Sequence, residues 1–110
     1  MLNLYTRSDS LLKINTEFRK GIMFVRIKGS LNKSNITTIT CDDFKYIVFN
    51  FDNLLSIDSY SVDYIINYNN KIKNDNGRLI ICDSNCNLIN NLFNGIIPII
   101  DNEIKAFNIL

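Results

Sequence analysis

Between residues 46 and 82 the sequence changes from a strand-length apolar run to a helix-period segment and back to an apolar run. The first run, Tyr46–Phe51, has the near-continuous apolarity of a strand that is buried on both faces. From Ser61 onward the apolar residues fall mostly at helical spacing, and the run Arg78–Cys82 follows. A helical crossover joins strands that run parallel. The sequence therefore predicts an α/β domain with Tyr46–Phe51 as a central strand.

The predicted helix has capping residues at both ends. Ser59 or Ser61 suits the N-cap position, because a serine hydroxyl accepts a hydrogen bond from a free N–H group of the first turn. Asn76-Gly77 closes the helix, since it supplies a residue that tolerates positive φ.

Two short runs rich in β-favouring residues, Leu11–Glu17 and Ile22–Lys28, precede this unit. The four residues between them include Gly21, so they predict a β-hairpin with a tight reversal. Gly29 is expected to end the second strand. The segment from Ser30 to Thr40 mixes β-branched residues with serines and asparagines, and it predicts a loop with at most one short helix.

The C-terminal third continues the alternation of helix and strand. A short helix is predicted between Cys86 and Phe93, with three residues turned inward: Leu88, Ile89 and Leu92. The run Ile96–Ile100 predicts a last strand. Proline cannot donate a ladder hydrogen bond, so Pro98 predicts that this strand lies at a sheet edge or breaks near its middle. Residues 103–110 predict one or two further helical turns.

The predicted fold class is thus α/β, with a single open mixed β-sheet and helices packed on it. An N-terminal β-hairpin is followed by the order β-α-β-α-β-α. The 110 residues suffice for one compact domain, so residues 1–110 are predicted to form a single domain.

Charge and composition exclude several function classes. Twelve lysines and arginines against 11 acidic residues give a net charge of +1, which provides no field to gather nucleic acid. Histidine is absent, and with it the commonest general base and the usual nitrogen ligand for zinc. No apolar run approaches the length of a membrane helix, and no export signal precedes the first strand, so neither membrane insertion nor export is expected.

The three cysteines, Cys41, Cys82 and Cys86, are an odd number and cannot form a complete set of disulfides. They indicate a reducing, cytoplasmic setting. Two thiols near Asp83 fall short of a tetrahedral metal site, so free thiols and no bound metal are expected. The glycines stand alone, so no phosphate-binding loop and no cofactor are predicted.

Four segments together resemble a known family. The stretch from Tyr46 to Ser59 resembles a strand, an acidic-leucine link and an Asp-Ser signature, and Gly77–Cys82 resembles the strand that follows. The segments 29–32 and 91–97 agree with the same pattern. Over most of its length the chain therefore resembles the STAS domain, which is named for sulfate transporters and anti-sigma factor antagonists.

The resemblance implies a function for Ser59. In stand-alone members the serine or threonine after the signature aspartate is phosphorylated by an anti-sigma factor that is also a serine kinase. The unphosphorylated form binds that factor and frees a sigma subunit, and a metal-dependent serine phosphatase restores it. By this resemblance the chain is an anti-sigma factor antagonist and not an enzyme, and Ser59 is its phosphoacceptor.

The signature departs from the family pattern. The family reads Asp-Ser-Ser-Gly or Asp-Ser-Thr-Gly, whereas this chain has Tyr60 and Ser61 after Ser59. Without the glycine, the backbone at Ser61 is expected to avoid positive φ. The segment between Gly29 and Tyr46 is short for the family, so the first helix is expected to be short or missing and the partner surface there to differ.

Physical chemistry gives Ser59 two interpretations. A phosphate at the start of a helix meets free N–H groups and the helix dipole, so it changes partner binding without unfolding the domain. Alternatively, Ser59 only caps the helix and Asp58 favours its first turn. The same turn supplies the candidate partner-binding residues: Asp58, Ser59, Tyr60, Ser61, Asp63 and Tyr64. Tyr64 could equally pack on the sheet beside Val62 and Ile66.

Two other functions stay open at this point. A divergent STAS scaffold, in a signalling or transport complex, would not be phosphorylated, and Tyr60 and Ser61 favour it. A small enzyme could use the paired carboxylates of Asp52 and Asp58, although no base, metal set or cofactor loop accompanies them.

Overall fold

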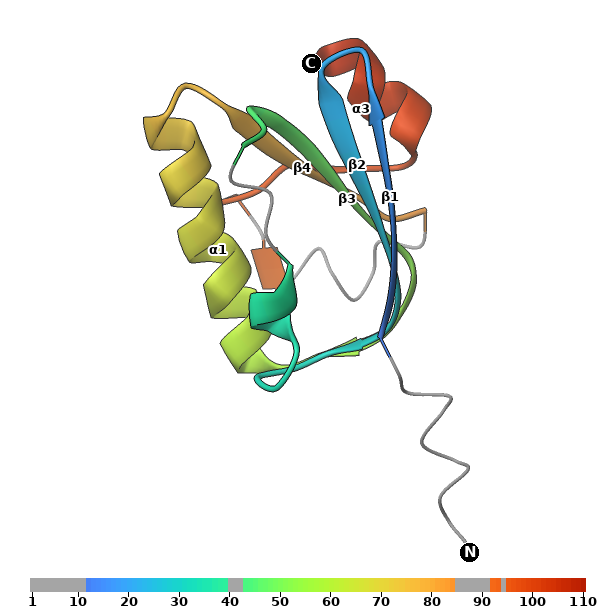
Figure 1. The fold of residues 1–110 in the computed structure, drawn as a ribbon, viewed down its shortest axis with the longest axis vertical. Helices are drawn as coiled ribbons and strands as arrows, with labels where there is room; N and C mark the ends of the chain where they lie inside the picture. Colours follow the sequence, from blue (N-terminus) through green and yellow to red (C-terminus); the bar gives the residue numbers. More distant parts are fainter. Residues whose placement is uncertain (1–11, 40–42, 85–91, 94) are drawn as a thin grey trace, which may run out of the picture.

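The computed structural model describes residues 12–39, 43–84, 92–93 and 95–110. In this part of the chain one sheet carries five strands in the order β1-β2-β3-β4-β5, and helices α1 and α3 lie on it (Figure 1). The elements are β1 Lys13–Arg19, β2 Ile22–Leu31, the 3-10 helix η2 Ile36–Thr38, β3 Tyr46–Ile57, α1 Ser59–Asn74, β4 Arg78–Cys82, β5 Ile99–Ile100 and α3 Glu103–Ile109. The predicted fold class is confirmed, with β3 in the middle of the sheet.

The sheet is mixed, as predicted. Strands β1 and β2 are antiparallel and form the hairpin, while β2, β3, β4 and β5 run parallel to one another. The hairpin turn is Lys20-Gly21, and both residues have positive φ, 51° and 83°. Two such residues match the right-handed twist of the flanking strands, which explains the tight reversal.

Two predicted strand ends are wrong. Gly29 does not end β2, which continues to Leu31. Instead Gly29 has a φ of 109° next to a shift in register, and a glycine there lets the strand bulge and go on. The residues after Phe51, predicted as a link, extend β3 to Ile57, because the longer β2 supplies backbone partners up to the pair Leu31 and Ile57.

In the described parts of the chain, helix α1 packs on one face of the sheet and helix α3 packs on the other. Helix α1 covers the larger core, to which it contributes four apolar residues: Val62, Ile65, Tyr68 and Ile72. Helix α3 covers a smaller core on the other face, centred on Phe24, Val48, Ile80 and Ala106. The strands between are buried on both faces, as their near-continuous apolarity predicts.

A partly buried ion-pair network fixes the start of α3 to the sheet. The guanidinium of Arg26 donates from Nε and Nη2 to the carboxylate of Glu103, at 2.8 and 2.7 Å, and from Nη2 to Glu17 at 2.9 Å. Asn50 also donates to Glu103, at 2.8 Å. Arg26, and then Asn50, hold the pKa of Glu103 below its usual range. The carboxylate that begins α3 is therefore ionised and tied to β2 and β3.

Most of the remaining predictions agree with the described residues. Between β2 and β3 these show only the single turn η2, in line with a short or missing first helix. Strand β5 lies at the sheet edge, as predicted, but it begins only at Ile99, directly after Pro98, so the predicted start of the strand at Ile96 is wrong. The proline breaks the apolar run because it cannot donate a ladder hydrogen bond. Helix α3 occupies the predicted C-terminal turns. None of the helices in the described ranges is long and apolar enough to cross a membrane.

The predicted helix between Cys86 and Phe93 falls mainly outside the described residues. At its end the structure corrects one detail, because Leu92 is 37% exposed, whereas Phe93 is fully buried and packs in the α1-side core. Phe93 lies against Phe51, with ring centroids 6.5 Å apart. The larger aromatic ring fills this place in the core instead of the leucine.

Candidate protein-binding site at the start of α1

The first turn of α1 and the turn after β2 lie together at the C-terminal ends of strands β2 and β3 (Figure 1). Strands β2 and β3 are parallel and end opposite each other, at Leu31 and Ile57. The N–H of Asp58 donates to the carbonyl of Leu31 at 3.1 Å, which joins the two chain segments just past the strands. Polar residues that follow β2 and β3 are thereby brought to one place.

Asp58, and not Ser59 or Ser61, is the N-cap of α1. Its Oδ1 accepts from the N–H of Ser61 at 2.8 Å, and its Oδ2 accepts from the N–H of Lys33 at 3.0 Å. A carboxylate reaches the free N–H of the third helical residue and carries a charge that the helix dipole favours, so it replaces the serines at this position. The same carboxylate ties the turn after β2 to the helix.

The pKa of Asp58 lies below its usual value, because of Ser61 and of the Lys33 N–H. Ser61 lowers this pKa through its hydroxyl, which lies near the carboxylate, and through its backbone N–H, which donates to it. The hydroxyl itself makes no hydrogen bond within the described residues. Asp58 is therefore an anion throughout the neutral range.

This lowered pKa predicts how the stability depends on pH. A carboxyl whose pKa is lower in the folded state stabilises the fold above its unfolded pKa, and this contribution is lost as the pH falls through the folded pKa. Asp58→Asn keeps an acceptor for the Ser61 N–H but does not titrate. We expect the difference in free energy of unfolding between the two proteins to favour the native protein at pH 7 and to shrink below about pH 4. Urea titrations across pH 2–7 measure it, and a constant difference contradicts the assignment.

Ser59 and Tyr60 face solvent beside this cap. Ser59 is the first residue of α1 and is exposed, and Tyr60 is 45% exposed. The Lys33 ammonium lies 5.5 Å from the centre of the Tyr60 ring, within the range of a cation–π contact. Asp63 is exposed on the next turn. The surface thus combines a hydroxyl, a ring and both signs of charge.

The other two candidate residues of this turn are less accessible. Ser61 is fully buried and lies within α1 without positive φ, as the absence of glycine predicts. Tyr64 is half-buried and packs against the α1-side core, as does Ile66. Of the six predicted partner-binding residues, Asp58, Ser59, Tyr60 and Asp63 are open to solvent.

Lys33 is a component of this surface that the sequence interpretation missed. It follows β2 by two residues and comes from the segment that was predicted as a loop. The signal that could have found it is the parallel pairing of β2 and β3, because the carboxyl ends of parallel strands lie at the same sheet edge. Residues that follow one strand then meet residues that follow the next.

The geometry does not favour the other sites considered from the sequence, which are a site built on the cysteines and a pair of catalytic carboxylates. Cys82 is buried, and burial, together with Glu103 and Asp52, raises the pKa of its thiol to about 12, so it is a neutral thiol. Cys41 and Cys86 lie outside the described residues, which contain no group of three metal-ligating side chains. Asp52 and Asp58 are six residues apart along an extended strand, about 20 Å, too far to share one reacting group.

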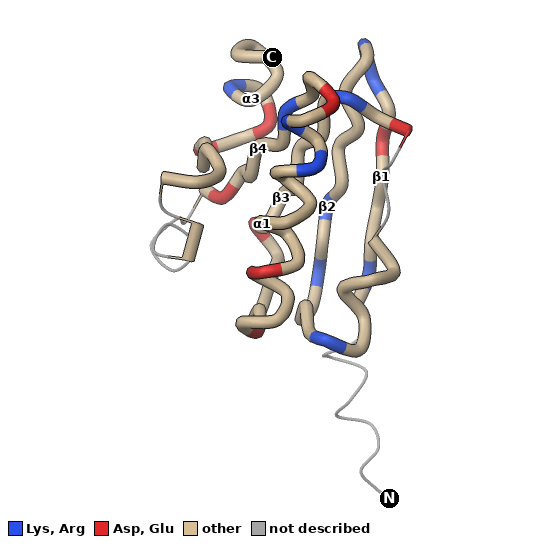
Figure 2. Tube along the Cα trace, turned by 90° about the vertical axis from the view of Figure 1, so that its left-hand side faces the viewer, with Lys and Arg blue, Asp and Glu red and all other residues tan. Residues whose placement is uncertain are grey.

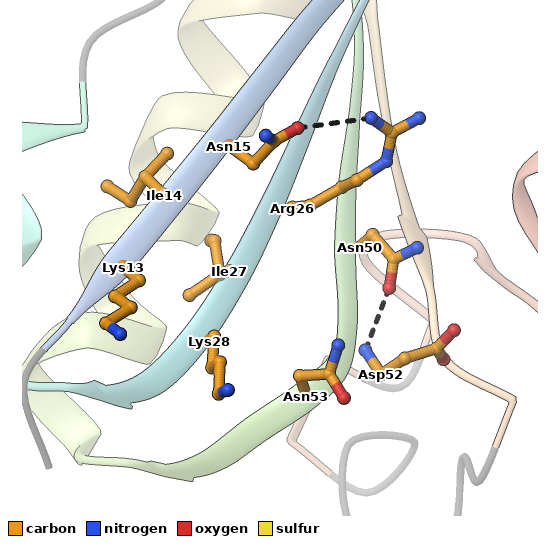
Figure 3. Close-up of a pocket in the computed structure, with 9 residues that line it drawn as sticks. All are labelled: Lys13, Ile14, Asn15, Arg26, Ile27, Lys28, Asn50, Asp52 and Asn53. Carbon is orange, nitrogen blue, oxygen red and sulfur yellow. Dashed lines mark hydrogen bonds between the residues drawn. The ribbon is translucent and has the colours of Figure 1, made fainter. Parts of the chain in front are cut away.

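A recess of about 490 Å³ lies elsewhere, on the α3 side of the sheet beside β1 (Figure 3). Asn15 points toward Arg26, whose Nη1 donates to it at 3.3 Å, and Ile14 points to the other face of the sheet. Lys13 and Lys28 are direct cross-strand partners on the recess side. None of the residues that line this recess belongs to the surface around Ser59.

No family model matches the sequence, and no curated protein matches it. Solved structures do match in fold. The unphosphorylated anti-sigma factor antagonist SpoIIAA superposes with a TM-score of 0.72 at 15% identity, over 89% of this chain and 94% of that chain. An antisigma-factor antagonist STAS domain from Rhodobacter sphaeroides superposes with a TM-score of 0.54 at 15% identity, over 66% of this chain and 87% of that one.

The chain has the STAS fold. The phosphorylated form of SpoIIAA, a Bacillus cell fate determinant, is also similar, with a TM-score of 0.63 at 17% identity over 87% of this chain and 97% of that chain. At these identities the similarity concerns the fold. Within the STAS fold of this chain, the capping aspartate and the exposed serine begin the long helix α1.

Proposed function

We propose that this chain is an anti-sigma factor antagonist that binds a kinase-type anti-sigma factor and is switched off by phosphorylation of Ser59. The observation that carries the proposal is an exposed serine directly after the aspartate that caps α1, in a STAS fold shared with anti-sigma factor antagonists. Its binding surface comprises Asp58, Ser59, Tyr60 and Asp63, together with Lys33.

The environment of Ser59 supports a switch that leaves the fold unchanged. A phosphate of charge about −1.5 to −2 at the start of α1 is favoured by the helix dipole, so the helix persists. The same phosphate stands beside the ionised carboxylate of Asp58 and on a surface that a partner must desolvate. Adding this charge weakens a close interface by repulsion and by the cost of desolvation.

In this proposal the chain is a substrate and a binding partner and performs no catalytic step. The anti-sigma factor supplies the kinase activity, and a serine phosphatase removes the phosphate. Both act in the cytoplasm, where we place this chain. This chain itself is proposed to bind no cofactor or metal.

Phosphate mapping distinguishes Ser59 from Ser61. Ser59 is exposed, whereas Ser61 is fully buried, so we expect incorporation at Ser59 alone when the protein is incubated with ATP, Mg²⁺ and the anti-sigma factor. Ser59→Ala is expected to abolish the incorporation of phosphate, and Ser61→Ala is expected to retain it. Mass spectrometry of the phosphopeptide provides the measurement. Incorporation into Ser59→Ala would mean that another residue is the acceptor.

The partner class is tested by a pull-down from the native cytoplasm, with unmodified protein and Ser59→Asp as parallel baits. Recovery of a kinase-fold anti-sigma factor by the unmodified bait alone supports both the partner and the switch. Recovery of no such factor by either bait contradicts the proposal.

A STAS scaffold without phosphorylation is the second candidate. The observation that favours it is Tyr60, a bulky exposed ring in place of the family's small hydroxyl residue. Tyrosines are enriched near the centres of protein–protein interfaces, and a ring of this size next to Ser59 hinders access of a kinase to the hydroxyl. In the same pull-down this function predicts that both baits retain the same partners.

A further inference from the structure

Among the described residues, strand β1 is an open edge of the sheet. It pairs with β2 on one side, and no other strand of the described chain lies on its outer side. Ile14 and Phe18 on this strand are 39% and 57% exposed, on the sheet face that carries the α1-side core. An edge with apolar side chains and free backbone groups favours pairing with another strand.

The hairpin turn fixes which backbone groups of β1 are free. The two-residue turn Lys20-Gly21 is flanked by the pair Arg19 and Ile22, which in such a turn exchanges both backbone hydrogen bonds. Hydrogen-bonded pairs then alternate along the strands. The backbone N–H and C=O groups of Ile14, Thr16 and Phe18 therefore point away from β2.

The opposite face of β1 carries a charge that lacks a counterpart. Lys13 lies directly opposite Lys28, and in the described chain neither ammonium is paired with a carboxylate. Like charges directly opposite each other in a sheet are destabilising. A carboxylate supplied from the outer side of β1 would relieve this repulsion.

We propose that two copies of this chain pair antiparallel through β1, with Asn15 opposite Asn15 of the second copy. In this register Lys13 faces Glu17 of the second copy, and the second copy's Lys13 faces Glu17 in return. Leu12 faces Phe18 of the second copy on the apolar side. A ten-stranded sheet results, and this inference is independent of the proposed function.

Charge selects this register over its two neighbours. A pairing centred on Ile14 places Lys13 opposite Asn15 of the second copy and so supplies no carboxylate. A pairing centred on Thr16 uses the same outward backbone groups, but it places Lys13 opposite Arg19 of the second copy. That arrangement adds a like-charge pair to the one that Lys13 already makes with Lys28. The register centred on Asn15 instead brings Lys13 opposite the carboxylate of Glu17, whose Oε1 already accepts from Arg26 within its own copy. The two lysines and the carboxylate attract, so this register is the favoured one.

The first test is the oligomeric state of the full chain by analytical ultracentrifugation. We expect the mean mass to rise toward that of a dimer as the concentration approaches about 1 mM. Thr16→Pro removes an outward N–H group that β2 does not use, so it is expected to abolish the dimer and keep the circular dichroism of the fold. A native protein that stays monomeric, or a dimer that persists in Thr16→Pro, overturns the proposal.

Lys13→Glu provides a second variant that does not depend on the behaviour of proline. It places a carboxylate opposite Lys28 within one copy and opposite Glu17 of the second copy. We expect the free energy of unfolding of the monomer to rise slightly and the dimer to weaken by about tenfold. If Lys13 acted only within its own copy, Lys13→Glu would leave the dimerisation constant unchanged. An unchanged constant therefore contradicts the proposed pairing.

Cysteine cross-linking tests the register. The two copies of Asn15 would form a non-hydrogen-bonded pair, with Cα atoms about 4.5 Å apart, within the range of a disulfide. Asn15→Cys is expected to cross-link to itself on mild oxidation more completely than its neighbour Thr16→Cys. Mass spectrometry of the linked peptides separates these bonds from any formed by the native cysteines. Preferential linkage of Thr16→Cys excludes the proposed register.

Discussion

Ser59→Asp is expected to keep the fold and to lower the affinity for the anti-sigma factor by at least about tenfold. The substitution places a second carboxylate beside that of Asp58, which is an anion at neutral pH and whose pKa lies below its usual value. At the start of α1 the added charge is tolerated by the helix dipole. In the interface it must be desolvated next to another anion, which is unfavourable. Titration calorimetry with the purified anti-sigma factor gives the affinity.

Ser59→Asn is the matched control, because asparagine has the shape of aspartate without its charge. We expect Ser59→Asn to bind within about threefold of the native protein, a difference below 1 kcal/mol. Thermal unfolding of both variants shows whether the fold is kept. Equal losses of affinity in Ser59→Asp and Ser59→Asn would mean that the size of the side chain, and not its charge, weakens the interface. The proposed phosphate switch would then lose its physical basis.

The sequence was most informative where local pattern and tertiary environment agree. The change from strand to helix spacing after Ser61, and the glycine-containing turn at Gly21, predict the parallel unit and the hairpin correctly. The ends of β2 and β3 were not predictable in this way. Whether a polar segment continues a strand depends on a backbone partner beside it, and β2 and β3 extend each other up to Leu31 and Ile57.

The candidate site also combines features that local sequence pattern predicts with features that only a tertiary contact decides. Asp58, Ser59 and Ser61 all have side chains that can cap a helix, so propensity alone does not choose among them. The choice follows from a tertiary contact, since the Asp58 carboxylate also accepts from the N–H of Lys33, 25 residues earlier in the chain. The charges at the two ends of α1 also fit the helix dipole, with Asp58 at the N-cap and Lys71 and Lys73 in the last turn. Figure 2 shows basic residues at the C-terminal end of this helix.

Gly77→Ala is expected to lower the free energy of unfolding by at least about 2 kcal/mol. The sequence assigns a positive φ to the pair Asn76-Gly77, and in the structure Asn76 adopts it, with φ of 66°. Gly77 is needed for another reason, because a Cβ atom at this position would collide with the carbonyl oxygen of Lys45 and with the side chain of Ile72. The Lys45 carbonyl is held in place, since it accepts from the N–H of Arg78 at 2.8 Å.

Gly21→Ala separates this steric effect from the general cost of replacing glycine. A Cβ atom at Gly21 meets nothing within 4 Å, and only the φ of 83° opposes the substitution, at about 1 kcal/mol. Urea unfolding at pH 7 compares the two variants. Because the Lys45 carbonyl joins the start of β3 to the start of β4, Gly77→Ala must separate α1 from the sheet or break this junction. If Gly77→Ala loses no more free energy of unfolding than Gly21→Ala, the junction relaxes freely, and close packing at Gly77 does not hold α1 against the sheet.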